Sequence, residues 1–378
     1  GGYVDVPLDQ ENTVRVSIHH AHMEEDAGKL THYDDYSLVD LNRAGTPLIE
    51  IVSEPDMHSA QEAKAYATEL HRIMTYAGVT LGDLYHGNMR FDVNVSIALK
   101  GSGVLGTRAE VKNLNSFRSV ERAVEYEFKR QVELLEKGEK VVQETRGWNE
   151  ATQKTTSQRS KEDAQDYRYM PDPDIPPIVL TNEDIARIQA DFPKLPAEYR
   201  SSWTGFELDS SVINAVLDHQ PVAKTLDAIV ERYSTTDTVK RIFNWFASLQ
   251  SDEIDIALVE SGLVGPARLV ELSEMVGDNK LSSTAAKEVF FALFDESNTG
   301  KMPEEIAKEK NLLQVSDESE IAAIVDAVLA DPASAQSIQD IKDGKEKAIG
   351  YLVGQVMKQS QGRANPGLAQ QLIKERMN

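Results

Sequence analysis

The sequence of 378 residues contains no cysteine, which excludes disulfide bonds and thiolate metal sites. It has no uninterrupted apolar run of the 18 or more residues that a membrane-spanning helix needs. Its first nine residues hold neither the basic nor the apolar segment of a secretory signal. We therefore expect a cytoplasmic protein.

Basic residues are also scarce. The chain has 40 Lys and Arg against 62 Asp and Glu, a net charge of −22. A uniformly acidic surface opposes binding to nucleic-acid phosphate, which depends on contacts from Lys and Arg. Residues 342–378 are the exception, with seven basic residues, three acidic ones and a net charge of +4. Their lysines could contact RNA phosphate, or they could simply balance nearby acids in a small amphipathic bundle.

No Walker A sequence is present, so an ATP site would have to be of another kind. Gly101-Ser-Gly103-Val-Leu-Gly106 matches the dinucleotide fingerprint G-x-G-x-x-G. That fingerprint must open a helix after a strand, whereas the residues that follow here alternate as in a strand. The pattern therefore indicates a glycine-rich hairpin loop.

The first part of the chain predicts strands and two helices. Period-two alternation occurs at residues 14–18, 89–99 and 107–112, and shorter strands are predicted at 38–41 and 48–52. The capping box Ser59-Ala-Gln-Glu62 predicts a helix that ends before Gly78. A second helix is expected over residues 117–137, with Val120, Val124, Phe128 and Leu135 on its buried stripe.

Composition changes at the proline-rich residues 171–177, after which helical patterns dominate. We predict an α+β protein of three units: a partial antiparallel-sheet cradle domain over 1–192, a helical domain over 193–310, and a small helical tail domain over 311–378. In the tail, Asp331-Pro332 and Asn365-Pro366 place proline at the first position of a helix, and Asp317 with Glu320 could cap another.

Polar residues at the end of an apolar strand are a candidate metal site. His20, His22 and Glu24 would point to one side of a strand, and carboxylates beside imidazole suit a hard cation such as Mg²⁺. A solvated strand end is the alternative. Glu50 lies within an apolar strand, where a carboxylate needs a partner, although an edge facing water would also explain it.

Two charged rows form a second candidate site. Arg90, Asp92, Asn94 and Ser96 alternate along one predicted strand, and Arg108, Glu110 and Lys112 along the next. If the two strands pair antiparallel, cross-strand neighbours make a charged floor with Asp92 and Glu110 on one face. Such a floor could hold Mg²⁺ and a triphosphate. The alternative is a sheet with one wet face.

Taken together, these segments resemble a known family. The blocks are HMEEDAGK (22–29), SLVDLNRAGTPLIEIVSEPD (37–56), MRFDVNVS (89–96), GTRAEVKNLNSFR (106–118), QETR (143–146), DYRYMPDPD (166–174), DGKEKAIGYLVGQVMK (343–358) and ANP (364–366). They resemble the signature blocks of the B subunits of the tRNA-dependent aspartyl/glutamyl-tRNA(Asn/Gln) amidotransferases. The resemblance covers essentially the whole chain.

The resemblance implies a ligase that phosphorylates the side-chain carboxylate of Glu-tRNA(Gln) or Asp-tRNA(Asn) with ATP and Mg²⁺, and then amidates it. It implies ammonia from an amidase (A) subunit, a small (C) subunit that completes a heterotrimer, and a misacylated tRNA bound by the tail. By motif, Glu24, Glu25 and Glu50 are metal and catalytic candidates. Further catalytic candidates are Asp92 and Glu110; phosphate or substrate candidates are Arg90, Asn94, Arg108 and Lys112; tRNA candidates are Lys345, Lys347, Lys358 and Arg363.

The sequence departs from the family pattern in three places. Phe91 stands where many relatives have Cys, and Met170 where many have Phe. No Glu-Val-His motif precedes His19, so we expect that the N-terminal part of the cradle is missing and that this chain alone is inactive. Two alternatives remain at this stage: a non-catalytic scaffold subunit that binds tRNA, and an acidic metal-binding interaction protein.

Overall fold

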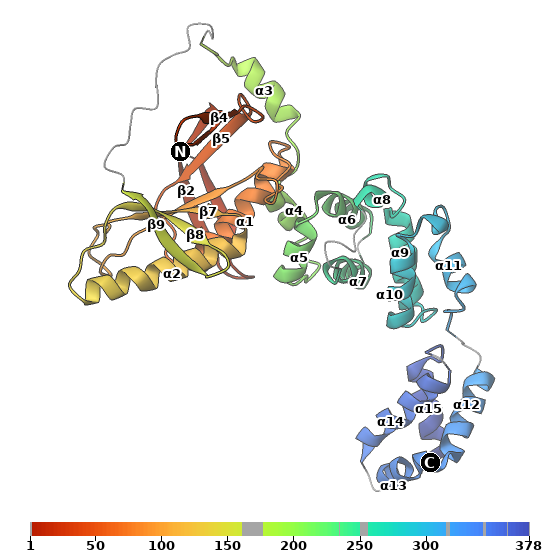
Figure 1. Ribbon diagram of the computed structural model, residues 1–378. Coiled ribbons are helices and arrows are strands. Elements are labelled where there is room, and N and C mark those ends of the chain that lie inside the picture. Colours follow the sequence, from red (N-terminus) through yellow and green to blue (C-terminus); the bar gives the residue numbers. More distant parts are fainter. Residues whose placement is uncertain are drawn as a thin grey trace. The chain divides into compact units, whose positions relative to one another are not determined.

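A computed structural model describes residues 2–160, 177–233, 235–249, 256–314, 318–342, 345–360 and 362–377. The chain divides into two compact units, residues 1–196 and 197–378 (Figure 1). The first combines sheets with helices and the second is helical, which confirms the α+β class. The three domain boundaries predicted from the sequence stay predictions. The block at 166–174 lies outside the described residues.

The chain opens with a three-stranded antiparallel sheet of order β1-β2-β5, made by Gly2–Pro7, Thr13–Glu25 and Pro47–Ser53. Val4, Val6 and Val16 are buried on one face and pack against Tyr66 and Leu70. This is the face that the alternation predicted. β1 pairs with residues 13–18 of β2, and β5 pairs with residues 18–25, with a break in register between Ile18 and His20.

A separate two-stranded sheet connects β2 to β5. Its strands are β3 (Lys29–His32) and β4 (Ser37–Asp40), and both are exposed along their whole length. The hairpin is closed by stacked rings of Tyr33 and Tyr36, whose centroids lie 4.7 Å apart.

The four-stranded sheet of the first unit has the order β6-β7-β8-β9, formed by Phe91–Val95, Ala109–Leu114, Glu144–Asn149 and Lys154–Ser160. β6 and β7 pair antiparallel as predicted, whereas β7 and β8 run parallel. The predicted strands 89–99 and 107–112 extend further into the connecting loop than β6 and β7 do. The residues from 96 to 108 form no strand, and Leu99 is 86% exposed rather than buried. A strand follows Gly106, which confirms the hairpin-loop interpretation.

Two long helices pack on these sheets. Helix α1 (Ala60–Tyr76) begins at Ser59, whose hydroxyl accepts from the Glu62 backbone N–H. Only half of the predicted capping box forms, since the Glu62 carboxylate accepts from the backbone N–H of His58 instead. Helix α2 (Phe117–Glu136) begins at Ser116. Ala63 and Ala67 of α1 and Val120 and Ala123 of α2 share a core with β7 and β8.

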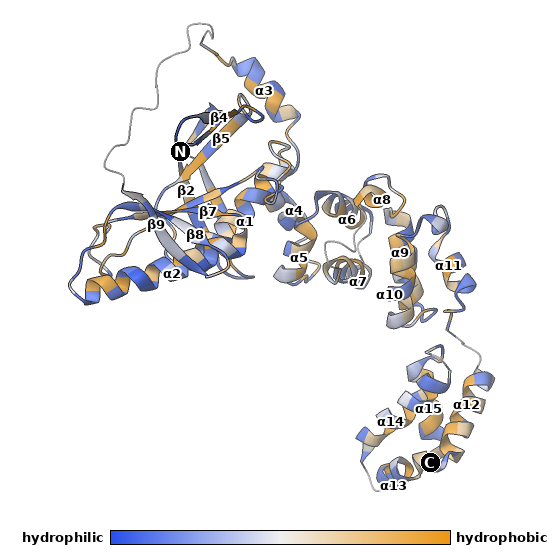
Figure 2. Cartoon of the chain, viewed as in Figure 1, coloured by the Kyte–Doolittle hydropathy of each residue, from blue (hydrophilic) through white to orange (hydrophobic). Residues whose placement is uncertain are grey.

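The predicted buried stripe of α2 is wrong at its C-terminal half. Phe128 and Leu135 are 55% and 46% exposed, while Glu127 and Gln131 are fully buried. Figure 2 shows hydrophilic and hydrophobic residues alternating along α2. The helix turns a polar side toward the sheet because the sheet offers hydrogen-bond partners there, as described below.

Helix α3 (Asn182–Ala190) has no buried residue. It is followed by α4 (Pro196–Ser202). Helices α5 to α11 come next along the chain. Their bounds are α5 (Ser210–Leu217), α6 (Gln220–Arg232), α7 (Thr236–Ala247), α8 (Ile256–Glu260), α9 (Pro266–Gly277), α10 (Ser283–Ala292) and α11 (Pro303–Glu309). Aromatic side chains bind them together, for example Trp203 against Phe243 with centroids 4.9 Å apart.

The last helices have a core of their own. They are α12 (Glu318–Ala330), α13 (Ala335–Lys342), α14 (Ile349–Gln359) and α15 (Pro366–Met377). Ile349, Leu352 and Val356 point inward, and Pro332 and Pro366 begin helical turns as predicted. The cap expected at Asp317 lies outside the described residues. Among the described helices none alone is long and apolar enough to span a membrane; Ser319–Ala330 and Pro332–Lys342 pass only as a pair bent by 75°.

Candidate functional site

A row of alternating charge crosses β6 and β7 on one face of the sheet, which we call the floor. The Lys112 ammonium lies 2.9 Å from Asp92 Oδ2 and 3.5 Å from Glu110 Oε1. Asn94 pairs directly with Glu110 across the strands. Thr145 of β8 extends the row by donating to Glu110 Oε2 at 3.0 Å. The predicted sharing of one face by Asp92 and Glu110 is confirmed.

The floor holds Lys112 in its charged form. Partial burial alone would lower the pKa of Lys112, but the hydrogen bond to Asp92 and the attraction of Asp92 and Glu110 outweigh it and raise the pKa above its ordinary value. A positive group is thus fixed between two carboxylates, an arrangement suited to binding charged substrate groups.

A β-bulge lies next to Lys112 in β7. Val93 pairs with Val111 but Phe91 pairs with Leu114, so β7 has one residue more than β6 at this point. Asn113 has a left-handed backbone (φ +67°), a conformation that asparagine tolerates better than most residues. Asparagine is unusual within a strand, so Asn113 stood out in the sequence, but the sequence did not show that it marks a bulge.

The floor continues onto the paired strands β8 and β9. Gly147 lies beside Lys112 in the register. A β-carbon built on Gly147 would come within 2.1 Å of the Gln158 side-chain nitrogen, so the Gln158 amide lies over the glycine. Gln158 was not among the predicted site residues, because only the pairing of β8 with β9 brings it to this face.

Two arginines lie at the ends of the hairpin strands. Arg90 precedes β6 and Arg108 precedes β7, and both are exposed. Neither makes a hydrogen bond or an ion pair with another residue in the described part of the chain. Guanidinium groups without internal partners are free to bind phosphate or carboxylate oxygens.

The predicted metal ligands are only partly brought together. His22 pairs directly with Glu50 across β2 and β5, and Glu24 pairs with Leu48, so His22, Glu24 and Glu50 share one face. Glu25 follows Glu24 in the strand and therefore points to the opposite face. Glu24 and Glu50 are exposed, which agrees with the alternative of a wet strand. In the described ranges no three His, Asp or Glu residues converge as a metal-binding group.

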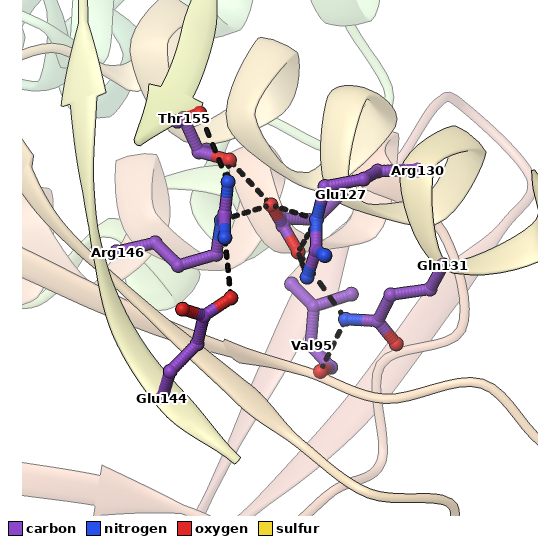
Figure 3. Close-up of polar contacts among 7 residues, drawn as sticks. All are labelled: Val95, Glu127, Arg130, Gln131, Glu144, Arg146 and Thr155. Carbon is purple, nitrogen blue, oxygen red and sulfur yellow. Dashed lines mark hydrogen bonds and ion pairs between the residues drawn. The ribbon is translucent and has the colours of Figure 1, made fainter. Parts of the chain in front are cut away.

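A buried ionic network supports the floor from behind (Figure 3). Glu127 of α2 is fully buried and accepts from Arg130 at 2.8 Å, while Arg146 of β8 lies 3.1 Å from it. Thr155 of β9 also donates to Glu127. Burial raises the pKa of Glu127, but the hydrogen bonds from Arg130 and Thr155 outweigh that effect and hold it below its ordinary value.

The same network reaches the floor strands. The Gln131 amide donates to the backbone oxygen of Val95 in β6 at 3.0 Å, and Arg146 pairs with Glu144 at the start of β8. The strands that carry Asp92 and Thr145 are thereby fixed to one helix.

A cavity of about 330 Å³ opens near the start of α2. Hydrogen bonds from Trp148 and Ser119 lower the pKa of Glu150 in its wall. The side chains that line it are Asn113, Asn115, Ser116, Ser119, Trp148 and Glu150.

The four tRNA candidates of the tail differ in their contacts. Lys345 pairs with Asp340 at 3.0 Å, and the Arg363 guanidinium donates to the Ser360 backbone oxygen at 3.4 Å. Lys347 and Lys358 are exposed and have no partner among the residues described. They are the better placed of the four for an external phosphate.

Comparison with known proteins gives a consistent result. Residues 1–186 match the family model "GatB/GatE catalytic domain" and residues 224–377 match "GatB domain". The chain is 44% identical to the B subunit of the aspartyl/glutamyl-tRNA(Asn/Gln) amidotransferase of Persephonella marina, over 99% of this chain and 78% of that protein. It is 43% identical to the protein of the same name from Janthinobacterium sp., over 100% of this chain and 79% of the relative. The identity to that of Thermosynechococcus vestitus is 42%, over 100% and 77%.

Proposed function

The chain belongs to the family of the B subunits of aspartyl/glutamyl-tRNA(Asn/Gln) amidotransferases, and we propose that the floor of its first unit is where the protein acts on its substrate. The proposed substrate is Glu-tRNA(Gln) or Asp-tRNA(Asn). In the first step a side-chain carboxylate oxygen attacks the γ-phosphorus of ATP and ADP leaves. In the second step ammonia attacks the resulting acyl-phosphate carbon and phosphate leaves.

The observation that carries this proposal is the alternating row Asp92–Lys112–Glu110, with an arginine at the end of each strand that has no partner among the described residues. Phosphoryl transfer needs positioning and charge neutralisation more than covalent chemistry from the protein. The Lys112 ammonium can neutralise a phosphate oxygen, while Arg90 and Arg108 can bind further phosphate or carboxylate oxygens. Asn94 offers an amide donor to the same face.

The donor set on the floor fits Mg²⁺. This ion takes one or two protein carboxylates and completes its shell with water and substrate phosphate. Asp92 and Glu110 are the two carboxylates that we propose would hold the ion, whose charge would offset that of a bound triphosphate. Lys112, which pairs with both of them in this structure, would then turn to a substrate phosphate. A catalytic or metal-binding role of Glu24, Glu25 and Glu50 remains a proposal. The fact that Glu24 and Glu50 share a face supports it for these two residues, whereas Glu25 points to the opposite face.

The partners we propose are an amidase (A) subunit that supplies ammonia, a small (C) subunit that completes a heterotrimer in the cytoplasm, and a misacylated tRNA. Lys347 and Lys358 of the tail are the proposed contacts to tRNA phosphate, with Lys345 and Arg363 as secondary ones. The net charge of +4 over residues 342–378 supports this.

The test uses the protein that carries this sequence, purified with its partner subunits. We expect Lys112→Met to lower ATP hydrolysis dependent on misacylated tRNA by roughly 10²- to 10³-fold, the range for loss of one positioned electrostatic donor. Lys129→Met is the matched control, because Lys129 is exposed on α2 and has no partner in the described part of the chain. Equal melting temperatures of the two variants would show that a folding defect does not cause the loss of ATP hydrolysis.

The competing proposal is a scaffold subunit that binds tRNA without catalysis. The match of residues 1–186 to a catalytic-domain model disfavours it. Under that proposal Lys112→Met would leave ATP hydrolysis at the level of Lys129→Met. That outcome would refute the assignment of the floor.

A further inference from the structure

Two loops that are distant in the sequence bring a pair of arginines together. Residues 41–46 connect β4 to β5, and residues 77–90 connect α1 to β6. An ideal β-carbon on Gly87 would lie 3.7 Å from Arg43 Nη1 and 3.7 Å from Arg90 Nε. These two guanidinium nitrogens are therefore no more than twice that distance apart. Apart from Gly87 and its two chain neighbours, the nitrogens of these two arginines are the heavy atoms nearest to the position of that β-carbon.

Arg43 is held in place by Asp26. Its Nε donates to Asp26 Oδ2 at 2.7 Å, and both side chains are partly buried. The backbone of Asp26 is itself fixed to the Arg43 loop, since its N–H donates to Thr46 and its carbonyl accepts from Gly45. This contact engages one edge of the guanidinium and leaves Nη1 directed at Gly87.

The loop that carries Gly87 is also well defined. Asp83 accepts from the backbone N–H of His86 at 2.9 Å and lies 2.6 Å from His86 Nδ1. Gly87 donates to the backbone oxygen of Leu84 and has φ +71°, a conformation that favours glycine. The close approach of Gly87 to both arginines is thus built into the turn.

The positive charges of Arg43 and Arg90 are not fully balanced by acidic residues in the described part of the chain. Asp26 offsets Arg43, but Arg90 has no ion-pair partner among the described residues. Two guanidinium groups this close repel each other, and an anion between them would remove that repulsion and accept hydrogen bonds from both. Arg90 lies two residues before Asp92, about 7 Å along the chain, so the pair adjoins the floor.

We infer that Arg43 and Arg90 form a binding subsite for one phosphate group at the end of the floor, with Asp26 as the positioning residue for Arg43. This inference rests on the proposed function in placing the substrate there. The phosphate belongs either to the nucleotide or to the tRNA backbone, since both carry the same oxygen chemistry. Arg43 was not among the predicted site residues, because nothing in the sequence pairs it with Arg90.

The experiment measures binding rather than turnover. Equilibrium dissociation constants for ATP and, separately, for uncharged tRNA are determined for the complex containing wild type, Arg43→Met, Arg90→Met and the double variant. Arg232→Met is the matched control, because Arg232 is an exposed arginine of the second unit without a described partner. Arg43→Lys tests whether charge alone suffices, and circular dichroism melting verifies the fold of each variant.

We expect each single variant to weaken binding of one of the two ligands roughly 10- to 100-fold, as for loss of a charge-assisted hydrogen bond. The double variant should lose less than the product of the two single effects, because both arginines bind the same group. A loss confined to ATP assigns the nucleotide phosphate, and a loss confined to tRNA assigns the backbone phosphate. Dissociation constants equal to those of Arg232→Met for both ligands, or fully multiplicative effects, would overturn the inference.

These outcomes are separate from those of the Lys112 test. If the Lys112→Met complex is folded but inactive, and Arg43→Met weakens binding of ATP or tRNA, both the role of the floor and the phosphate subsite are supported. If instead Lys112→Met left ATP hydrolysis intact and Arg43→Met still weakened binding, only the role of the floor would fail.

Discussion

Replacing Glu127 by Gln should destabilise the first unit, because it removes the one anion that faces two arginines in a buried network. Gln keeps the shape of the side chain but has no charge, and its NH₂ group faces the donors of Arg130 or Arg146. Glu127 is completely buried, while the side chains of Arg130 and Arg146 are 19% and 11% exposed. Breaking a buried ion pair from one side costs about 3–5 kcal/mol.

We expect a value near the lower end, about 3 kcal/mol, because both arginines keep some contact with water. For a unit of this size that corresponds to a melting temperature lower by roughly 6–12 °C. Calorimetry measures the shift, and hydrogen exchange over residues 117–136 locates it to α2. Glu125→Gln is the matched control, because Glu125 is exposed on the same helix and has no described partner.

The effect should also depend on pH. The pKa of Glu127 in the folded protein lies below its ordinary value of 4.5, so its stabilising contribution is fully present above about pH 5. It is lost as the pH falls through the folded pKa. The gap in melting temperature between wild type and Glu127→Gln should therefore narrow once the pH falls below that ordinary value. Equal melting temperatures of Glu127→Gln and Glu125→Gln at neutral pH would refute the reasoning.

Two further predictions concern the tail and the bulge. Lys347→Ala and Lys358→Ala should each reduce the slope of log affinity for tRNA against log salt concentration by about 0.7–0.9 for each phosphate contact that the variant removes. Unchanged slopes in a salt titration would exclude these lysines as phosphate ligands. Deletion of the residues beyond about 310 should weaken tRNA binding while the glutaminase activity of the complex persists. Asn113→Val should cost about 1–2 kcal/mol, because a β-branched residue is strained at φ +67°, whereas Asn113→Gly should be near neutral. Chemical denaturation measures both Asn113 variants, and equal stabilities would contradict the strain argument.

The helices and most strands followed from local patterns. Ser59 and Ser116 mark the starts of α1 and α2, and Pro366 begins α15, because cap and proline effects act within a few residues. The antiparallel pairing of β6 with β7 was also predictable, since a glycine-rich loop joins two strands of matching alternation. The family resemblance came from blocks of residues in order and needed no structure.

Helix α2 shows where local patterns failed. Its apolar residues predicted that Phe128 would be buried, whereas Glu127 is buried in its place. A carboxylate can be buried only if partners compensate its lost hydration. Those partners, Arg146 and Thr155, come from β8 and β9, so hydrophobic periodicity within the helix contains no signal for them.

The sequence by itself determined the class of fold, the starts of the main helices, the family and the face shared by Asp92 and Glu110. Only the tertiary structure decided that Glu50 lies on the same face as His22 and Glu24, and that Gln158 lies over Gly147. It alone placed Arg43 beside Arg90. The physical reason is that propensity, capping and alternation act over a few residues, whereas these contacts depend on strand register and loop approach between separate strands and loops.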